Sequence, residues 1–268
     1  MKVNDMPAKK ERIVVKVGTS TLAYPGGGIN FRELDTLTRV LADMMNMGLQ
    51  VVLVTSGAIG VGMGKLGLSE RPRDTAGKQA AATVGQCELM YLYDKLFSDY
   101  GCTVGQLLIT KGDVEDKERR RNLVNTFERL FQYNVLPIIN ENDAVAVDEI
   151  VYGDNDNLSA IVAVLVMASK LMILTDIDGL YDSNPKTDKK ARLIPQVLEI
   201  TPEIIALARD SETGLGTGGM VTKLQAAQTA TKAGIDTFVL NGRPLENIYR
   251  LLDGEAVGTW FRAVKHDN

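Results

Sequence analysis

The segment NVLPIINEND, residues 134–143, joins a short apolar run directly to a polar cluster. The run at residues 135–139 is mostly branched and apolar, which is typical of a buried strand in a parallel sheet. Ten residues after Asp143, the sequence GDNDN (153–157) opens into the apolar run LSAIVAVL (158–165), which predicts a buried helix. Ligands of α/β proteins bind at the carboxyl ends of strands and at helix N-termini. Two polar clusters around one connection therefore favour a ligand pocket, and the alternative is a solvated turn capped by Asn and Asp side chains.

Strand-like and helical segments alternate on both sides of this segment. A helix is expected after Asn30, which would cap it, and a long Ala-rich helix from Asp74 to Tyr100, in which Gly85 is a candidate break. Alternation of this kind predicts a mainly parallel sheet covered on both faces. We therefore predict an α/β fold, a three-layer αβα sandwich that forms a single domain over residues 1–268 with its core at about 12–262. The other expected strands cover residues 13–17, 50–55, 103–109, 170–174 and 237–240.

Composition and charge exclude several classes of protein. The chain has 30 Lys and Arg against 34 Asp and Glu, a net charge of −4, which disfavours a broad basic face for nucleic acid. Residues 1–12 lack the apolar core of a signal peptide, and the most apolar run, residues 160–168, is too short to cross a bilayer. With 2 cysteines, neither a disulfide framework nor a cysteine metal site is expected. We therefore expect a cytoplasmic protein that binds neither nucleic acid nor membranes.

The single histidine restricts the chemistry further. It is His266, which lies in the polar tail of the chain. A Ser-His-Asp triad, a Cys-His pair or a histidine-ligated metal needs a histidine in the body of the fold. Any catalysis would therefore use Lys, Asp, Asn, Ser, Thr and backbone amides.

Two lysines stand beside turns that are suited to anions. Lys16 is near the end of the first strand, just before the turn at residues 18–20, and Lys223 lies one turn into a helix that follows the glycine-rich run 214–219. Backbone amides of such turns and of helix N-termini bind anions. A lysine that extends its ammonium group to solvent, and a plain glycine linker, are the respective alternatives. Residues 56–58 follow another strand directly and present amides and one hydroxyl.

The sequence GMGKLG, residues 62–67, matches the dinucleotide-binding pattern GxGxxG only superficially. That pattern should begin at the end of a strand, whereas here it begins seven residues after Thr55. We therefore do not predict dinucleotide binding.

Polar clusters follow four of the expected strands, after Val17, Thr55, Ile139 and Leu174. The carboxyl ends of parallel strands lie along one edge of a sheet, so these clusters are expected to converge. Two lysines, two glycine-rich turns and several carboxylates and amides are suited to phosphoryl transfer, in which the protein mainly positions groups and neutralises charge. An attacking carboxylate needs no general base, because it is already ionised at neutral pH.

Five motifs occur in this order: Lys16 to Ser20 (KVGTS), Thr55 to Ala58 (TSGA), Asn140 to Asp143 (NEND), Gly153 to Ala160 (GDNDNLSA) and Gly216 to Lys223 (GTGGMVTK). Together they resemble the glutamate 5-kinases of the amino acid kinase superfamily over about residues 12–261. The lysine-led first strand is shared with acetylglutamate kinase, aspartokinase and uridylate kinase, whereas the NEND and GDNDN pair points to the glutamate enzymes. The resemblance implies the amino acid kinase fold, in a form without the C-terminal PUA domain of many bacterial relatives.

The resemblance implies phosphorylation by ATP of the side-chain carboxylate of L-glutamate, giving L-glutamyl 5-phosphate for proline biosynthesis. It implies catalytic roles for Lys16 and Lys223, which would neutralise the transferred phosphoryl group, and for Asp176, which would orient both lysines through ion pairs. Mg²⁺ would be carried by the nucleotide phosphates, with no protein metal site. The implied glutamate site comprises Ser56, Asp143 and Asn155, with Asp154 and Asp156 beside them, and the implied ATP site comprises Lys16, Thr175, Asp176, Thr217, Gly218, Gly219, Met220, Val221, Thr222 and Lys223.

The resemblance also implies partners. Proline would inhibit by feedback at or near the glutamate site, and the chain would form a homo-oligomer, a dimer or a tetramer. Because acyl phosphates hydrolyse readily, we expect the product to be passed to a glutamyl phosphate reductase. Two alternatives stay open: another carboxylate or carbamate kinase of the same family, and a non-catalytic amino-acid sensor on the same fold.

Overall fold

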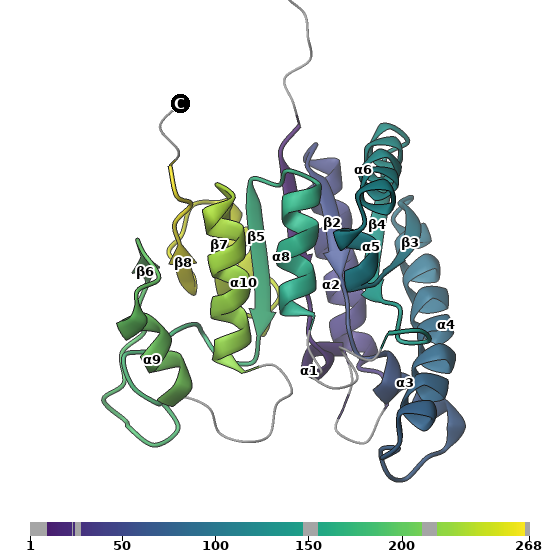
Figure 1. The fold of residues 1–268 in the computed structure, drawn as a ribbon, viewed down its shortest axis with the longest axis horizontal. Coiled ribbons are helices and arrows are strands. Elements are labelled where there is room, and N and C mark those ends of the chain that lie inside the picture. The colour runs from purple at the N-terminus through teal and green to yellow at the C-terminus, as the bar shows by residue number, and fades with distance from the viewer. Residues whose placement is uncertain (1–9, 23, 25–27, 147–154, 211–218, 266–268) are drawn as a thin grey trace, which may run out of the picture.

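A computed structural model describes residues 10–22, 24, 28–146, 155–210 and 219–265 of the chain. In this part of the chain the strands form one 8-stranded sheet with the order β3-β4-β2-β1-β5-β7-β8-β6 (Figure 1). Neighbouring strands are parallel except β7 and β8, so the predicted, mainly parallel sheet is confirmed. The strands are β1 (Arg12–Lys16), β2 (Gln50–Val54), β3 (Thr103–Ile109), β4 (Val135–Glu141), β5 (Lys170–Thr175), β6 (Gln196–Val197), β7 (Asp236–Asn241) and β8 (Thr259–Phe261).

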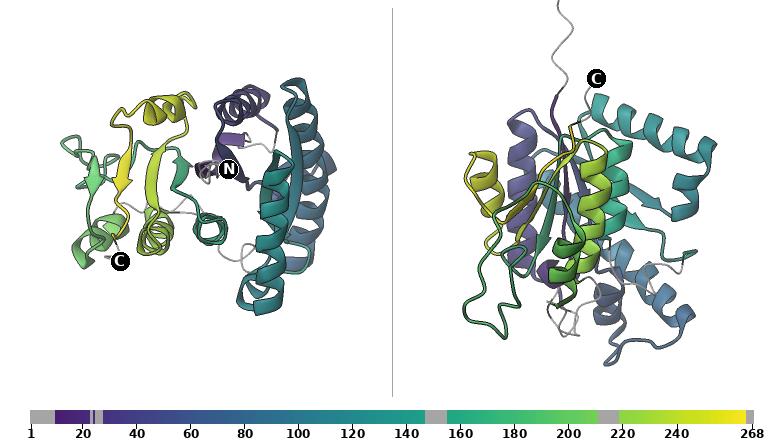
Figure 2. Two further views of the ribbon diagram at one scale, coloured as in Figure 1. Left: turned by 90° about the horizontal axis from the view of Figure 1, so that it is seen from above. Right: turned by 60° about the vertical axis from the view of Figure 1, so that its left-hand side comes forward.

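Helices cover both faces of the sheet and leave two separate apolar cores. Alternate side chains of a strand point to opposite faces. Accordingly, Ile13 and Val15 of β1 pack in one core, whereas Val14 packs in the other. Seen from above, α2 and α11 lie on one side of the sheet and α8 and α10 on the other, which confirms the three layers (Figure 2). The helices are α1 (Thr19–Leu22), α2 (Phe31–Asn46), α3 (Ala58–Leu66), α4 (Thr75–Asp99), α5 (Lys111–Glu115), α6 (Lys117–Gln132), α8 (Asp156–Leu165), α9 (Pro202–Asp210), α10 (Met220–Lys232) and α11 (Asn247–Leu252).

Helix α4 runs without interruption through Gly85, so the suggested break at this glycine was wrong. The glycine instead allows α4 to approach α3 closely. A Cβ atom on Gly85 would lie 1.8 Å from the carbonyl oxygen of Ala58, and one on Gly62 would lie 1.8 Å from that of Ala81. Gly62, the first glycine of the superficial GxGxxG match, therefore serves helix packing.

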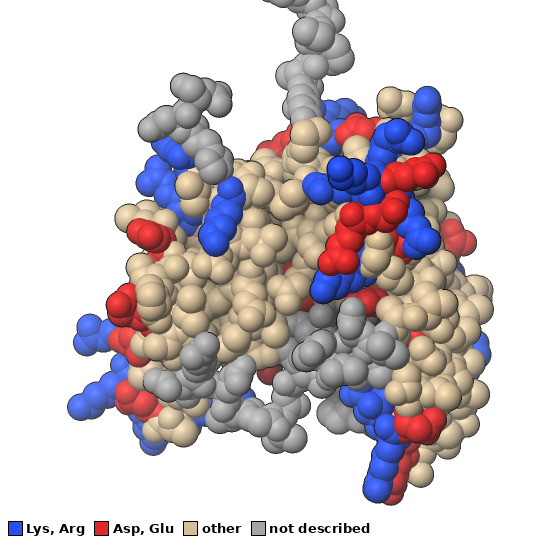
Figure 3. Space-filling view, in the orientation of Figure 1, with Lys and Arg blue, Asp and Glu red and all other residues tan. Residues whose placement is uncertain are grey.

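The helix start predicted at Asn30 is confirmed. The side chain of Asn30 caps α2 by accepting a hydrogen bond from the backbone N–H of Glu33. The charged run from Asp113 to Arg121 spans the end of α5 and the start of α6, where Arg119 pairs with Asp113 at 3.1 Å. Acidic and basic side chains intermix on this part of the surface, at the upper right of Figure 3. This run is therefore a solvated helix surface.

No helix in the described ranges is both long enough and apolar enough to pass through a membrane.

The position of β1 decides where a ligand site can form. The chain continues from β1 to β2 on one side through α2, and it later reaches β5 on the other side through α8. These two helices lie on opposite faces of the sheet, so a crevice is expected at the carboxyl ends of β1 and its neighbours. Lys16 is the last residue of β1 and lies at this edge.

Candidate active site

Lys16 and Lys223 meet on one buried carboxylate. The Lys16 ammonium lies 2.7 Å from Oδ1 of Asp156, and the Lys223 ammonium lies 3.0 Å from Oδ2 of the same residue. The Thr222 hydroxyl lies 2.9 Å from that Oδ2 atom. Asp156 is fully buried, and Lys16 and Lys223 are 3% and 5% exposed. The predicted convergence of these lysines, more than two hundred positions apart, is therefore confirmed.

Three elements hold this cluster. Lys16 ends β1, Asp156 begins α8 and Lys223 lies in the first turn of α10. A carboxylate in the first turn of a helix is stabilised by the helix dipole. A buried ammonium group is costly without an anion beside it, so Asp156 offsets part of that cost for both lysines.

Asp176 does not take the position that we expected. Its side chain is exposed, and no ion pair joins it to Lys16 or Lys223 in the part of the chain that the structure describes. Its carboxylate instead lies 3.3 Å from the hydroxyl of Thr175, the last residue of β5. The ion pairs predicted for Asp176 are made by Asp156, because only Asp156 starts a helix that packs against both α10 and β1.

Asn155 begins a chain of buried amides that leads away from the lysines. Its Nδ2 atom donates to the carbonyl oxygen of Thr55 and to Oδ1 of Asn140, both at 2.6 Å. Asn140 Nδ2 then donates to Oε1 of Gln86 on α4, at 2.8 Å. The Thr55 hydroxyl lies 2.9 Å from the hydroxyl of Tyr93, and burial raises the pKa of this tyrosine far above its ordinary value. The predicted site residue Asn155 is thus held by hydrogen bonds to Asn140 of β4 and to Thr55, which directly follows β2.

Ser56 and Asp143 lie at the same edge of the sheet. Ser56 is buried after β2, and its hydroxyl donates to the carbonyl oxygen of Val17 at 3.2 Å. Asp143 follows β4 and is 8% exposed. Burial raises the pKa of Asp143 from 3.8 to about 6, although the nearby Arg71 guanidinium acts in the opposite direction.

Most of the residues predicted to bind ATP lie at the start of α10 or just before it. Gly219 caps the N-terminus of α10, and the Thr222 side chain faces Asp156. Met220 and Val221 pack against the apolar core, and Val221 is only partly buried. Three predicted site residues lie outside the described residues: Asp154, Thr217 and Gly218.

Sequence reasoning missed two members of the amide chain, Asn140 and Gln86, as site residues. Asn140 belongs to the polar cluster after the apolar run, but nothing in that cluster distinguishes it from its neighbours. Gln86 carries a clearer signal, because it interrupts the buried stripe of α4 formed by Ala82, Leu89 and Tyr93.

In the described residues no three His, Cys, Asp or Glu side chains gather closely enough to hold a metal ion. Asp156, the carboxylate at the centre of the cluster, is already engaged by two ammonium groups.

Comparisons with known proteins agree with this geometry. The model of the amino acid kinase family matches residues 11–241. A glutamate 5-kinase of Clostridium perfringens is 51% identical over 95% of this chain and 96% of its own length. One of Listeria innocua is 48% identical over 96% of this chain and 95% of its own length.

Solved structures show the same fold at low sequence identity. A carbamate kinase from Giardia lamblia bound to AMP-PNP gives a TM-score of 0.65 at 18% identity, covering 95% of this chain and 99% of that chain. A UMP kinase from Bacillus anthracis gives 0.62 at 17% identity, covering 95% of this chain and 97% of that chain. The predicted fold and the resemblance seen in the motifs are both confirmed, and the chain belongs to the amino acid kinase family and, within it, to the glutamate 5-kinases.

Proposed function

We propose that this chain transfers the γ-phosphoryl group of ATP to the side-chain carboxylate of L-glutamate, the first step of proline biosynthesis. The observation that carries the proposal is the pair of buried ammonium groups on the two oxygens of Asp156, at the carboxyl edge of a parallel sheet. The names of the relatives supply the substrate, and the geometry supplies a means of phosphoryl transfer.

The lysines would act on the charge of the transferred group. A carboxylate oxygen of glutamate attacks the γ-phosphorus, and the bond from that phosphorus to the bridging oxygen breaks, which releases ADP. Negative charge spreads over the phosphoryl oxygens during this step. Lys16 and Lys223 neutralise it from two sides, and Asp156 keeps both ammonium groups in register. Since these groups are fixed before the substrate binds, little reorganisation accompanies the reaction.

The nucleotide would lie against α10. Amides at the N-terminus of this helix, from Gly219 onward, suit phosphate oxygens. Thr175 and Asp176, at the carboxyl end of β5, would line the same site. Mg²⁺ would reach the site on the phosphates of ATP, where it supplies further positive charge.

Glutamate would bind beside β2 and β4. Ser56 and Asn155 would hold it near the lysines, and the Asp143 carboxylate would accept hydrogen bonds from its ammonium group. N-acetylglutamate has no ammonium group for Asp143, which argues against an acetylglutamate kinase.

An assay with parallel substrates tests the proposal. The purified chain is given ATP and Mg²⁺ with glutamate, aspartate, N-acetylglutamate or carbamate, and the acyl phosphate is trapped with hydroxylamine. We expect glutamate to be preferred. Preference for another acceptor would make the chain a different kinase of the family, and no transfer to any of them would support the alternative of a sensor.

Four further predictions from the sequence remain proposals. They are inhibition by proline at or near the glutamate site, a homo-oligomeric state, transfer of the product to a glutamyl phosphate reductase, and a cytoplasmic location. Repeating the assay with proline, and measuring the mass of the enzyme in solution, test the first two.

A further inference from the structure

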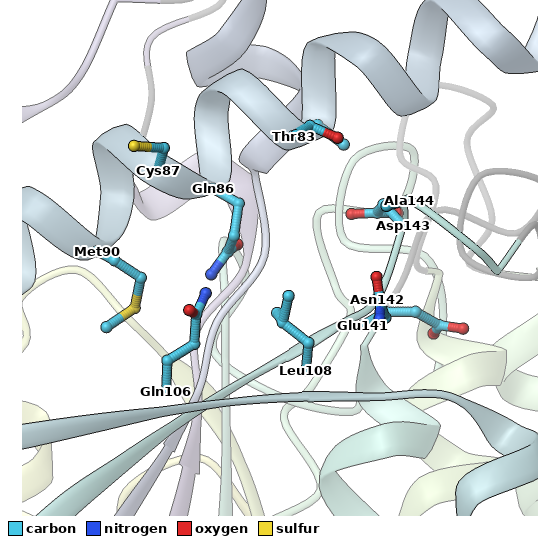
Figure 4. Close-up of a pocket in the computed structure, with 11 residues that line it drawn as sticks. Thr83, Gln86, Cys87, Met90, Gln106, Leu108, Glu141, Asn142, Asp143 and Ala144 are labelled. Carbon is cyan, nitrogen blue, oxygen red and sulfur yellow. The ribbon is translucent and has the colours of Figure 1, made fainter.

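A cavity of about 370 Å³ lies between α4, β3 and the turn after β4. Its lining includes Gln86 and Met90 from α4, Gln106 and Leu108 from β3, and Asp143 from the turn (Figure 4). The amide chain from Asn155 through Asn140 ends at this cavity in Gln86. The cavity is thus connected to the residue next to Asp156.

The hydrogen bonds fix which end of the Gln86 amide faces the cavity. Two backbone groups fix the orientation of the Asn155 and Asn140 side-chain amides. The carbonyl oxygen of Thr55 can only accept a hydrogen bond, and the backbone N–H of Glu141 can only donate one. Asn155 must therefore present Nδ2 to Thr55, and Asn140 must present Oδ1 to Glu141 and Asn155. Asn140 Nδ2 then meets Oε1 of Gln86, which leaves Nε2 of Gln86 for the cavity.

Two buried polar atoms of this lining have no partner among the described residues. They are Nε2 of Gln86 and Oδ1 of Asp143, in side chains that are 9% and 8% exposed. Buried donors and acceptors are almost always paired, since an unpaired one is costly. One atom donates and the other accepts, so a ligand that satisfies both must carry an acceptor and a donor. A carboxylate and an ammonium group on one carbon, the main-chain end of an amino acid, meet this requirement.

We propose that Gln86 is a specificity-determining residue that donates a hydrogen bond from Nε2 to the α-carboxylate of the substrate, while Asp143 binds the ammonium group. The inference rests on the proposed function and assigns the main-chain end of glutamate to the cavity. The side-chain carboxylate then points toward Lys16 and Lys223. Figure 4 shows the amide of Gln106 pointing toward that of Gln86, and Gln106 is exposed.

A purely structural role for Gln86 makes a different prediction. If Gln86 only braces Asn140 and Asn155, its loss would weaken the binding of every acceptor to the same extent. Direct recognition instead makes the loss depend on whether the ligand carries the α-carboxylate.

Three ligands separate these possibilities. Glutamate has both main-chain groups, 4-aminobutyrate lacks the α-carboxylate, and glutarate lacks the ammonium group. The KM for glutamate is measured, together with inhibition constants of the other two against glutamate phosphorylation. In Gln86→Met we expect the KM for glutamate and the inhibition constant of glutarate to rise by about tenfold to a hundredfold. This is the usual effect of a lost hydrogen bond to a charged group. The constant for 4-aminobutyrate and the kcat should change less than about threefold.

Asp143→Asn should show the complementary pattern. The KM for glutamate and the inhibition constant of 4-aminobutyrate should rise by about tenfold to a hundredfold, whereas the inhibition constant of glutarate should not rise. Gln132→Met, an exposed glutamine at the end of α6, is the matched control and should leave all three constants unchanged.

A second variant, Gln86→Glu, keeps the test valid if Gln86→Met does not fold. Glu keeps an oxygen for Asn140 and nearly the same volume, but it places a carboxylate against the α-carboxylate of the ligand. In this variant too, we expect the binding of glutamate and glutarate to weaken more than the binding of 4-aminobutyrate. Equal weakening of all three ligands in both variants, or no change in any, overturns the inference. Failure of the wild-type chain to phosphorylate glutamate would overturn the proposed function instead, so the two failures are distinguishable.

Discussion

Replacing Asp156 by Asn tests the central electrostatic feature of the site. Asn has nearly the same volume, but it removes the negative charge that lies 2.7 Å from one ammonium group and 3.0 Å from the other. Both lysines are almost fully buried, so water cannot replace that charge without a rearrangement. An amide placed between the two ammonium groups would also turn a donor toward one of them.

The size of the effect follows from this burial. Removing one partner of a buried ion pair typically costs about 3–5 kcal/mol, because an uncompensated charge is left behind. For a chain of 268 residues the entropy of unfolding is about 0.6 kcal/mol per degree. We therefore expect the melting temperature of Asp156→Asn to fall by about 5–9 °C, with a comparable loss in urea unfolding.

Asp176→Asn is the matched control for this measurement. Asp176 is exposed and pairs with neither lysine among the described residues, so its replacement should change stability by less than about 0.5 kcal/mol. Thermal unfolding followed by circular dichroism measures both variants. A loss below about 1 kcal/mol in Asp156→Asn, or an equal loss in the two variants, would refute the assignment of Asp156 as the shared counter-ion.

Three further predictions concern turnover, pH and packing. Lys223→Met should lower kcat by about a hundredfold to a thousandfold with little change in the KM for glutamate, because the Lys223 ammonium acts on charge that develops in the transition state. Steady-state kinetics measure this effect. The control Lys189→Met, at an exposed position, should match the wild type. The pKa of Asp143 is about 6 in the folded protein against 3.8 in the unfolded chain, so its contribution to stability is present below pH 3.8 and is lost as the pH rises through about 6. The pH dependence of glutamate binding is opposite to that of stability, because the substrate ammonium needs the ionised Asp143 carboxylate. The KM for glutamate should therefore rise as the pH falls below about 6, whereas the inhibition constant of glutarate should not change with this titration. Gly85→Ala should cost about 3 kcal/mol or more in urea unfolding, since its Cβ would lie 1.8 Å from the Ala58 carbonyl oxygen, whereas Gly112→Ala, with no contact nearer than 3.8 Å, should cost less than about 1 kcal/mol.

Local patterns were sufficient for the elements and for the edge at which the site lies. The apolar run after Asn134 became β4, and the polar residues that follow it stand at the carboxyl edge of the sheet. Asn30 capped α2 because the Asn side chain reaches backbone groups only a few residues away. The same kind of signal failed at Gly85, because a glycine that breaks a helix and one that admits a neighbouring helix look alike in sequence.

The sequence by itself determined the alternation of strands and helices, their parallel order, and the supply of lysines, carboxylates and amides to one edge. These properties depend on periodicity and on neighbours along the chain. Only the tertiary structure decided that Asp156, not Asp176, neutralises the two lysines, and that Gln86 of α4 completes the chain of amides from Asn155. Both aspartates lie in polar clusters beside buried segments, and the local sequence around each one does not show which carboxylate points into the protein. That choice depends on the packing of α8 against β1 and α10, which brings together groups 67 positions apart or more.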